Sequence, residues 1–168
     1  ADTLSPAPAG RTSAASLRDR LDAIIATLQA AQAKTDGYLN AFCINHQGQS
    51  LPWGIPIAPW GHTGLHDGYV AGHLIEAAIA HHNATGSTAM LEVAKKAANQ
   101  AYTHFMIKRA PGFTEHAEFE LALVELYRVT GDAKYLSLSQ HLVEQRGKTP
   151  STVGWTGNRA YCQDDLPA

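Results

Sequence analysis

The chain repeats a helical hairpin at an offset of 45 residues. When residues 72–94 are laid over residues 117–139, Thr85-Gly86 aligns with Thr130-Gly131, and Leu91 aligns with Leu136. A repeat of roughly 40–50 residues with two helices per unit is typical of helical repeat proteins and of α/α toroids, in which each hairpin buries its flank against its neighbours. Two unrelated helix pairs with ordinary end signals are the alternative.

Helical periodicity predicts five helices and no sheet. Apolar residues recur at three- and four-residue steps near residues 16–33, 67–82, 88–102, 114–130 and 132–146, and no alternating pattern competes with them. Thr114 and Asp132 are expected to cap the last two helices. The fold class is therefore predicted to be all-α, with helical hairpins forming part of an α/α toroid.

Two further local predictions concern residues 38–64 and the helix expected at residues 67–82. Residues 38–44 read as a short extended or irregular piece, and seven Gly and Pro residues between positions 48 and 64 predict a long ordered loop. Within residues 67–82, Val70, Leu74, Ala77, Ala78 and His81 recur at the three- and four-residue steps of a helix.

Composition excludes several partners. The 168 residues suit one domain, and because 45% are hydrophobic and 17% charged, much of the chain should be buried. The net charge of -2 and the absence of any basic run argue against nucleic acid and anionic membranes. No run reaches the roughly 18–20 apolar residues of a membrane span, so a soluble protein is expected. The Ala- and Pro-rich start resembles a processed end, which favours a secreted or extracellular location.

Histidines gather in one stretch, because five of them lie between residues 62 and 82. His66 and His73 are seven residues apart, or about 10.5 Å along a helix, which is too far for both to reach one metal ion. No HExxH motif is present, so hydrogen-bonding histidines are favoured over zinc. With Tyr69 and Glu76, His66 and His73 could line a polar pocket at a helix end. The alternative is a pair of structural histidines on a helix flank.

A second polar cluster contains Glu115, His116, Glu118 and Glu120. Most of it is expected to form a solvated first turn, because successive positions point to different faces of a helix. Glu120 lies between Phe119 and Leu121 and would need a partner if buried. Common nucleophile and phosphate-binding motifs are absent. Cys43 and Cys162 permit either one disulfide or two free thiols.

Three sequence blocks together resemble glycoside hydrolase family 127, the β-L-arabinofuranosidase family. They are DGYLNAF at residues 36–42, HDGYVAGHLIEAAIAHHNATG at 66–86 and HAEFELALVELYRVTGDAKYL at 116–136, followed by RG and QDDLPA. The resemblance implies an (α/α)6 barrel whose inner helix ends and loops hold a small furanoside. It divides the chain into a flexible lead at residues 1–15 and a partial α/α-toroid, glycosidase-like domain at residues 16–168, which cannot close a barrel.

The resemblance also implies site residues. Matching the family's blocks residue by residue gives the sugar-contacting positions His66, Tyr69, His73, His116 and Glu118. The chain departs from the family pattern at Asp67, Gly68, Val70 and Asp165.

Catalytic groups are expected to come from elsewhere. Members of the family use a cysteine nucleophile beside a zinc ion held by cysteines and a glutamate, with a separate glutamate as the acid. Cys43 and Cys162 match none of those positions. The resemblance therefore implies no cofactor and no metal site in this chain, with zinc in full-length members, and the identity of any catalytic residue stays open.

Two functions follow from this interpretation. The first is binding or hydrolysis of L-arabinofuranosyl-type glycans, with a glycan or small furanoside as the partner. The second is a non-catalytic structural or binding module that self-assembles. An arc of hairpins would leave apolar flanks on the helices at residues 16–33 and 132–146, so either the missing half of the barrel or a second copy of the chain is expected to cover them.

Overall fold

The structure, a computed structural model, describes residues 14–52, 54, 56–61, 63–112, 114 and 116–145. The helices in chain order are α1 (Ala14–Gln32), α2 (Ala41–His46), the 3₁₀ helix η1 (Thr63–Leu65), α3 (Asp67–Thr85), α4 (Ala89–Tyr102), the π-helical turn η2 (Thr103–Ile107), α5 (Glu118–Thr130) and α6 (Ala133–Gln145). Within these ranges an isolated bridge joins Ser50 to Pro56, and no strand is formed. The all-α prediction is confirmed.

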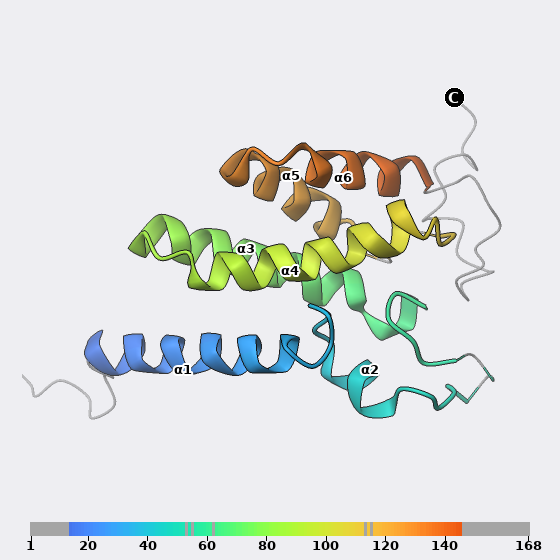
Figure 1. Cartoon of the computed structure of the whole chain (residues 1–168), viewed down its shortest axis with the longest axis horizontal. Coiled ribbons are helices and arrows are strands. Elements are labelled where there is room, and N and C mark those ends of the chain that lie inside the picture. Colours follow the sequence, from blue (N-terminus) through green and yellow to red (C-terminus); the bar gives the residue numbers. More distant parts are fainter. Residues whose placement is uncertain are drawn as a thin grey trace, which may run out of the picture.

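The hairpin repeat is visible as two pairs of adjacent helices, α3 with α4 and α5 with α6 (Figure 1). Both first helices end in the same way, with a glycine in the left-handed conformation: φ is 73° at Gly86 and 72° at Gly131. Each glycine N–H donates to the carbonyl four residues earlier, at 2.8 Å and 2.7 Å. Glycine adopts this conformation without strain, so the Thr-Gly pairs end the helices where the sequence predicts.

The hairpins stack in layers. α3 packs closely on α5, α4 packs more lightly on α6, and α1 lies against α4 on the other side of the first hairpin (Figure 1). This arrangement is an open part of an α/α toroid.

The predicted flexible lead at residues 1–15 lies almost wholly outside the described residues, and Glu115, Cys162 and Asp165 lie outside them as well. None of the described helices is both long and apolar enough to cross a membrane.

The core lies where the two hairpins meet. Its largest fully buried side chains come from all four of their helices: Ile75, Val93, Phe119, Leu123, Leu126, Tyr135, Leu138 and Leu142. α3 buries Gly68, Ala71, Gly72, Ile75 and Ala78. Val70 and Ala77 fit the helical steps but are exposed, so periodicity alone does not select the face that meets α5.

Two local predictions also need correction. Residues 41–46 form α2 rather than an extended piece, because the Asn40 side chain accepts hydrogen bonds from the N–H groups of Phe42 and Cys43 at 3.1 Å and 3.3 Å. Thr114 does not cap α5, which begins at Glu118. Asp132 does accept a hydrogen bond from the Lys134 N–H at the start of α6, as expected.

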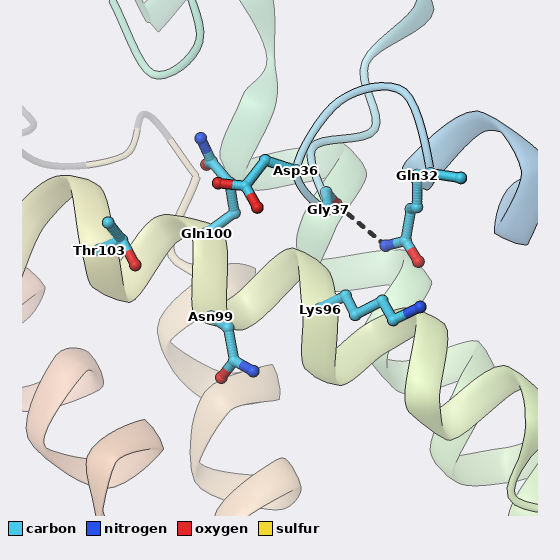
Figure 2. A pocket seen from close by; sticks show the side chains of 8 residues that line it. Gln32, Asp36, Gly37, Lys96, Asn99, Gln100 and Thr103 are labelled. Atoms are coloured by element: carbon cyan, nitrogen blue, oxygen red, sulfur yellow. Dashed lines mark hydrogen bonds between the residues drawn. The ribbon is translucent and has the colours of Figure 1, made fainter.

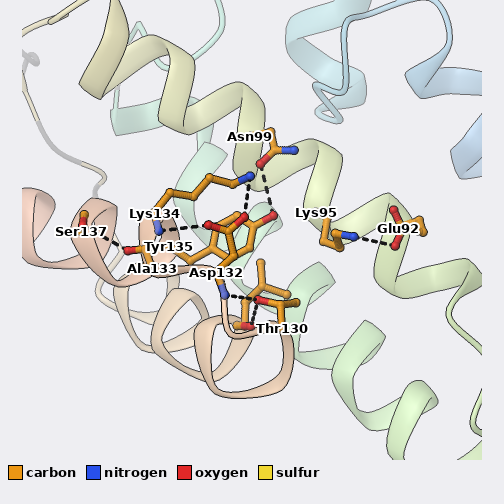
Figure 3. A network of polar contacts seen from close by, with 10 residues as sticks. Glu92, Lys95, Asn99, Thr130, Asp132, Ala133, Lys134, Tyr135 and Ser137 are labelled. Atoms are coloured by element: carbon orange, nitrogen blue, oxygen red, sulfur yellow. Dashed lines mark hydrogen bonds and ion pairs between the residues drawn. The ribbon is translucent and has the colours of Figure 1, made fainter.

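Polar contacts connect α4 to α6 beside the core (Figure 3). The Tyr135 hydroxyl donates to Asn99 Oδ1 at 3.2 Å, although the Tyr135 residue is fully buried. Burial, followed by the negative charges of Asp132 and Glu92, raises the pKa of Tyr135 to about 12. The folded state therefore holds this phenol in its neutral form more strongly than the unfolded chain does.

This shift predicts a loss of stability at high pH. The unfolded phenol ionises near its ordinary pKa of 10.0, so stability is complete below that pH and is lost as the pH rises toward about 12. We expect Tyr135→Phe to reduce the slope of unfolding free energy against pH in this window by up to about 1.4 kcal/mol per pH unit. Urea unfolding at several pH values measures both slopes. Identical slopes in the two proteins would show that Tyr135 does not titrate in this way.

Candidate functional site

Four of the five predicted sugar-contacting residues come together where α3 meets α5. Tyr69 and His73 lie one turn apart on α3, His116 precedes α5, and Glu118 is the first residue of α5. His73 Nδ1 lies 2.5 Å from Glu118 Oε1, and His116 Nδ1 lies 3.8 Å from Glu118 Oε2. The carboxylate of Glu118 therefore lies between two imidazoles. We call these four residues the His–Glu cluster.

Ring contacts complete the His–Glu cluster. The Tyr69 ring lies edge-on to the imidazoles of His73 and His116, with centroid separations of 4.3 Å and 5.0 Å. The side chains of His73 and His116 are 48% and 46% exposed, whereas that of Glu118 is only 14% exposed. The cluster thus presents two imidazoles and a phenol to solvent, above a shielded carboxylate.

Two glycines of α3 allow the close approach of α5. A Cβ atom added at Gly68 would lie 2.6 Å from the Thr114 Cβ, and one added at Gly72 would lie 3.1 Å from Cγ of Glu118 and from the Phe119 nitrogen. Side chains at these positions would push the two segments apart, because such contacts are shorter than van der Waals distances. A larger side chain at position 68 would not fit beside Thr114.

His66, the fifth predicted site residue, occupies the position before α3. It has a left-handed conformation with φ of 58°, and it is exposed. The structure therefore places it at the end of α3 that carries Tyr69.

A buried carboxylate fixes this end of α3. Asp67 is 4% exposed, and its Oδ1 accepts hydrogen bonds from the Tyr38 hydroxyl at 2.5 Å and from Asn40 Nδ2 at 2.7 Å. Its Oδ2 accepts from the Trp60 N–H at 2.7 Å. The Asp67 side chain therefore joins the start of α3 to the segment that holds Tyr38 and Asn40 and to the loop that holds Trp60. Burial, followed by the negative charge of Asp67, raises the pKa of Tyr38 and keeps its hydroxyl as a donor.

Sequence reasoning missed Tyr38, Asn40 and Trp60 as supports of the site. The signal that could have found them is the block at residues 36–42 together with an acidic residue at the first position of an apolar helix. Trp60 also stacks on Phe119 of α5, with centroids 5.4 Å apart. The long loop is therefore ordered by the same elements that carry the His–Glu cluster.

Glu120 is buried, as its apolar neighbours suggest. It is 4% exposed, and the Thr114 hydroxyl donates to its Oε1 at 3.4 Å. The Ser139 hydroxyl of α6 donates to the Glu120 carbonyl at 2.8 Å. This residue therefore helps to hold α5 against α6 rather than facing solvent.

Glu76 lies three residues after His73 on α3, and its carboxylate is close to both His73 and Glu118. Ligand atoms of His73, Glu76 and Glu118 all lie within 4.8 Å of one another. The sequence argument against metal considered spacings between histidines and the absence of an HExxH motif, and it did not bring Glu76 and Glu118 together because they lie on different helices.

The family's cysteine-based zinc centre does not fit the described residues. Among the residues that the structure describes, Cys43 is a free cysteine, and it is 1% exposed. Burial raises the pKa of its thiol, which opposes the thiolate form that zinc requires.

A separate open groove of about 370 Å³ lies between the end of α1 and α4 (Figure 2). Polar side chains line it, and the Gln32 amide at its edge donates to the carbonyls of Gly37 and Val93 at 2.9 Å and 2.8 Å. No residue of the His–Glu cluster lines this groove.

The stacked hairpins and the cluster at the end of α3 define a part of an α/α toroid of the glycoside hydrolase type. The chain belongs to the β-L-arabinofuranosidase family GH127, because the model of its catalytic domain matches residues 8–168. It is 47% identical over 87 residues to a non-reducing end β-L-arabinofuranosidase of Bifidobacterium longum subsp. longum. That match covers 51% of this chain and 13% of the relative.

Two solved GH127 structures are also similar. One is a β-L-arabinofuranosidase from Geobacillus stearothermophilus T6, with a TM-score of 0.65 and 38% identity over 80% of this chain and 20% of the other. The second is a β-arabinofuranosidase with a TM-score of 0.60 and 30% identity, covering 80% of this chain and 22% of the other. The chain thus spans about a fifth of each solved relative.

Proposed function

We propose that this chain binds an L-arabinofuranosyl unit of a glycan through the His–Glu cluster. The observation that carries the proposal is the convergence of Tyr69, His73, His116 and Glu118 on one accessible surface. Membership of the family supports it, as do the arabinofuranosidase activities for which the similar proteins are named.

The chemistry of the cluster suits a small sugar. The shielded carboxylate of Glu118 can accept a hydrogen bond from a sugar hydroxyl, and each imidazole can donate or accept one. The exposed ring of Tyr69 offers an apolar surface to the C–H groups of the sugar ring. His66 is proposed as a further contact from the start of α3. An extracellular location would suit a glycan ligand and stays a prediction.

Hydrolysis is proposed to need further groups. Glycoside cleavage uses two carboxyl groups in distinct roles, or another nucleophile in place of one of them. The His–Glu cluster supplies the carboxylate of Glu118, the neighbouring carboxylate of Glu76 is exposed, and Cys43 is buried. We therefore assign glycan binding to this chain and assign no catalytic residue within it.

Titration with methyl β-L-arabinofuranoside tests this proposal. We expect nitrogen–proton NMR spectra to show saturable shifts at the cluster residues, with affinity in about the millimolar range. The double variant His73→Ala, His116→Ala should weaken binding at least about tenfold, because it removes two hydrogen-bonding groups. The control His46→Ala, His82→Ala changes histidines outside the cluster and should bind as the wild type does.

Circular dichroism first establishes that both variants fold. Equal binding by the wild type and the cluster variant, or no saturable shifts up to about 100 mM sugar, would contradict the assignment.

Self-assembly is the second candidate, favoured by exposed apolar side chains on the outer helices. Leu17 and Ile24 of α1 are 57% and 52% exposed, and Leu136 and Val143 of α6 are each 40% exposed. Covering a large apolar side chain contributes about 1.5–3 kcal/mol, so a contact between these flanks would be favourable. The proposed occupant is a second copy of the chain.

Sedimentation velocity at micromolar concentration tests the association. We expect species above the monomer mass of 18.0 kDa for the wild type and monomer for Leu17→Lys, Ile24→Lys, because charge opposes burial of that flank. Leu121→Lys changes a side chain of α5 with the same exposure as Leu17 and serves as the control. A single monomeric species in the wild type, without dye-binding apolar surface, would rule out assembly.

A further inference from the structure

His73, Glu76 and Glu118 form a three-residue arrangement that suits a metal ion. His73 and Glu76 are three residues apart, so they lie on neighbouring positions of one face of α3. Glu118 approaches from α5, and the candidate ligand atoms of all three lie within 4.8 Å of one another. We infer that this arrangement binds one divalent first-row transition ion, of which Zn²⁺ is the best fit.

The contact between His73 and Glu118 requires either a hydrogen on Nδ1, which neutral imidazole can carry, or a cation bound by both atoms. Glu118 Oε1 is shielded from solvent and accepts no hydrogen bond of good geometry, yet His73 Nδ1 lies only 2.5 Å from it. A carboxylate oxygen and an imidazole lone pair repel each other at this separation, and a shielded anionic oxygen is costly unless it is compensated. Either a proton on the imidazole or a bound cation removes the conflict.

Glu76 is the feature that favours a metal ion over a proton. One proton between His73 and Glu118 would leave the carboxylate of Glu76 within 4.8 Å of that of Glu118, where two negative charges repel each other. A divalent ion is neutralised by both carboxylates and takes the imidazole as its third ligand. A site with one or two histidines and carboxylates is a usual zinc set, in which a fourth position holds another donor.

The ligand types of His73, Glu76 and Glu118 and their exposure to solvent determine which metal ions can bind. Imidazole selects zinc, nickel, cobalt and copper over magnesium and calcium, which prefer oxygen ligands throughout. His73 and Glu76 are exposed, so their side chains can turn toward an ion and an entry path is open. His116, whose Nδ1 lies 3.8 Å from Glu118 Oε2, is positioned to supply a fourth ligand.

This site differs from the cysteine-containing zinc centre that the family resemblance implies. It shares His73 and Glu118 with the proposed sugar surface, but it adds Glu76, which the sugar proposal does not use. The metal site stands on the ligand geometry alone and does not depend on sugar binding.

Calorimetric titration of the chelator-treated 168-residue chain with ZnCl₂ tests the inference. We expect one Zn²⁺ per chain at micromolar or lower concentration, and no binding of MgCl₂ under the same conditions. Glu76→Gln should weaken Zn²⁺ binding at least about tenfold, because it removes an anionic ligand from an exposed position that the fold does not need. Glu92→Gln, an exposed glutamate of α4, is the matched control and should bind as the wild type does.

Cobalt provides a second measurement on the same variants. Co²⁺ bound by nitrogen and oxygen ligands in a four-coordinate site gives intense visible absorption bands, which Glu76→Gln and His73→Ala should each abolish. Absence of saturable Zn²⁺ binding, equal affinity in Glu76→Gln and wild type, or unchanged bands in His73→Ala would overturn the inference.

Sugar titration in the presence of chelator separates the two proposals. Saturable arabinofuranoside binding by metal-free Glu76→Gln would support the sugar proposal whatever the zinc result is. Zinc binding by a chain that shows no sugar binding would support the metal site and contradict the sugar proposal alone.

Discussion

Close packing of α3 on α5 at Gly68 and Gly72 is the constraint on which the rest of the structure depends. Without side chains at these positions, the backbone of α3 lies directly against Thr114 and the first turn of α5. This approach brings Glu118 to His73 and places His116 beside Tyr69. Two residues that contribute no side chain therefore determine the geometry of all the polar groups in the site.

The buried carboxylate of Asp67 supplies the second constraint. Hydrogen bonds from Tyr38, Asn40 and Trp60 tie the segment before α2 and the long loop to the first residue of α3. A charged group in this position is stabilising only while all of these donors remain in place, since an uncompensated buried charge is costly. Trp60 of the loop is thus held beside the site.

The sequence predicted those features that follow from local signals. The Thr-Gly pairs at 85–86 and 130–131 end their helices through glycine φ angles of 73° and 72°. The sequence indicated that Glu120 would need a partner if buried, and its buried carboxylate accepts a hydrogen bond from Thr114. Features that depend on packing between helices were not predictable in this way. Val70 is exposed although it fits the helical period, because the approach of α5 selects the glycine face of α3.

The same limit applies to the site. Family resemblance assigned Tyr69, His73, His116 and Glu118, and the structure brings them together, but spacing along one helix could not show that Glu76 would meet a carboxylate from α5. Nor did the α2 cap at Asn40 appear as a helix signal, since a six-residue helix has too little periodicity to detect.

The most direct test of the account is the proximity of the His73 ring to the Glu118 side chain in Gly72→Ala, measured by nuclear Overhauser effects. An added Cβ would press on Cγ of Glu118 and on the Phe119 nitrogen at 3.1 Å, so the account predicts a strong effect in the wild type and a weaker one in the variant. Ala77→Gly, at an exposed position of the same helix, destabilises α3 by about 1 kcal/mol through helix propensity and should retain the effect. An unchanged effect in Gly72→Ala would contradict the claim that glycine packing sets the site.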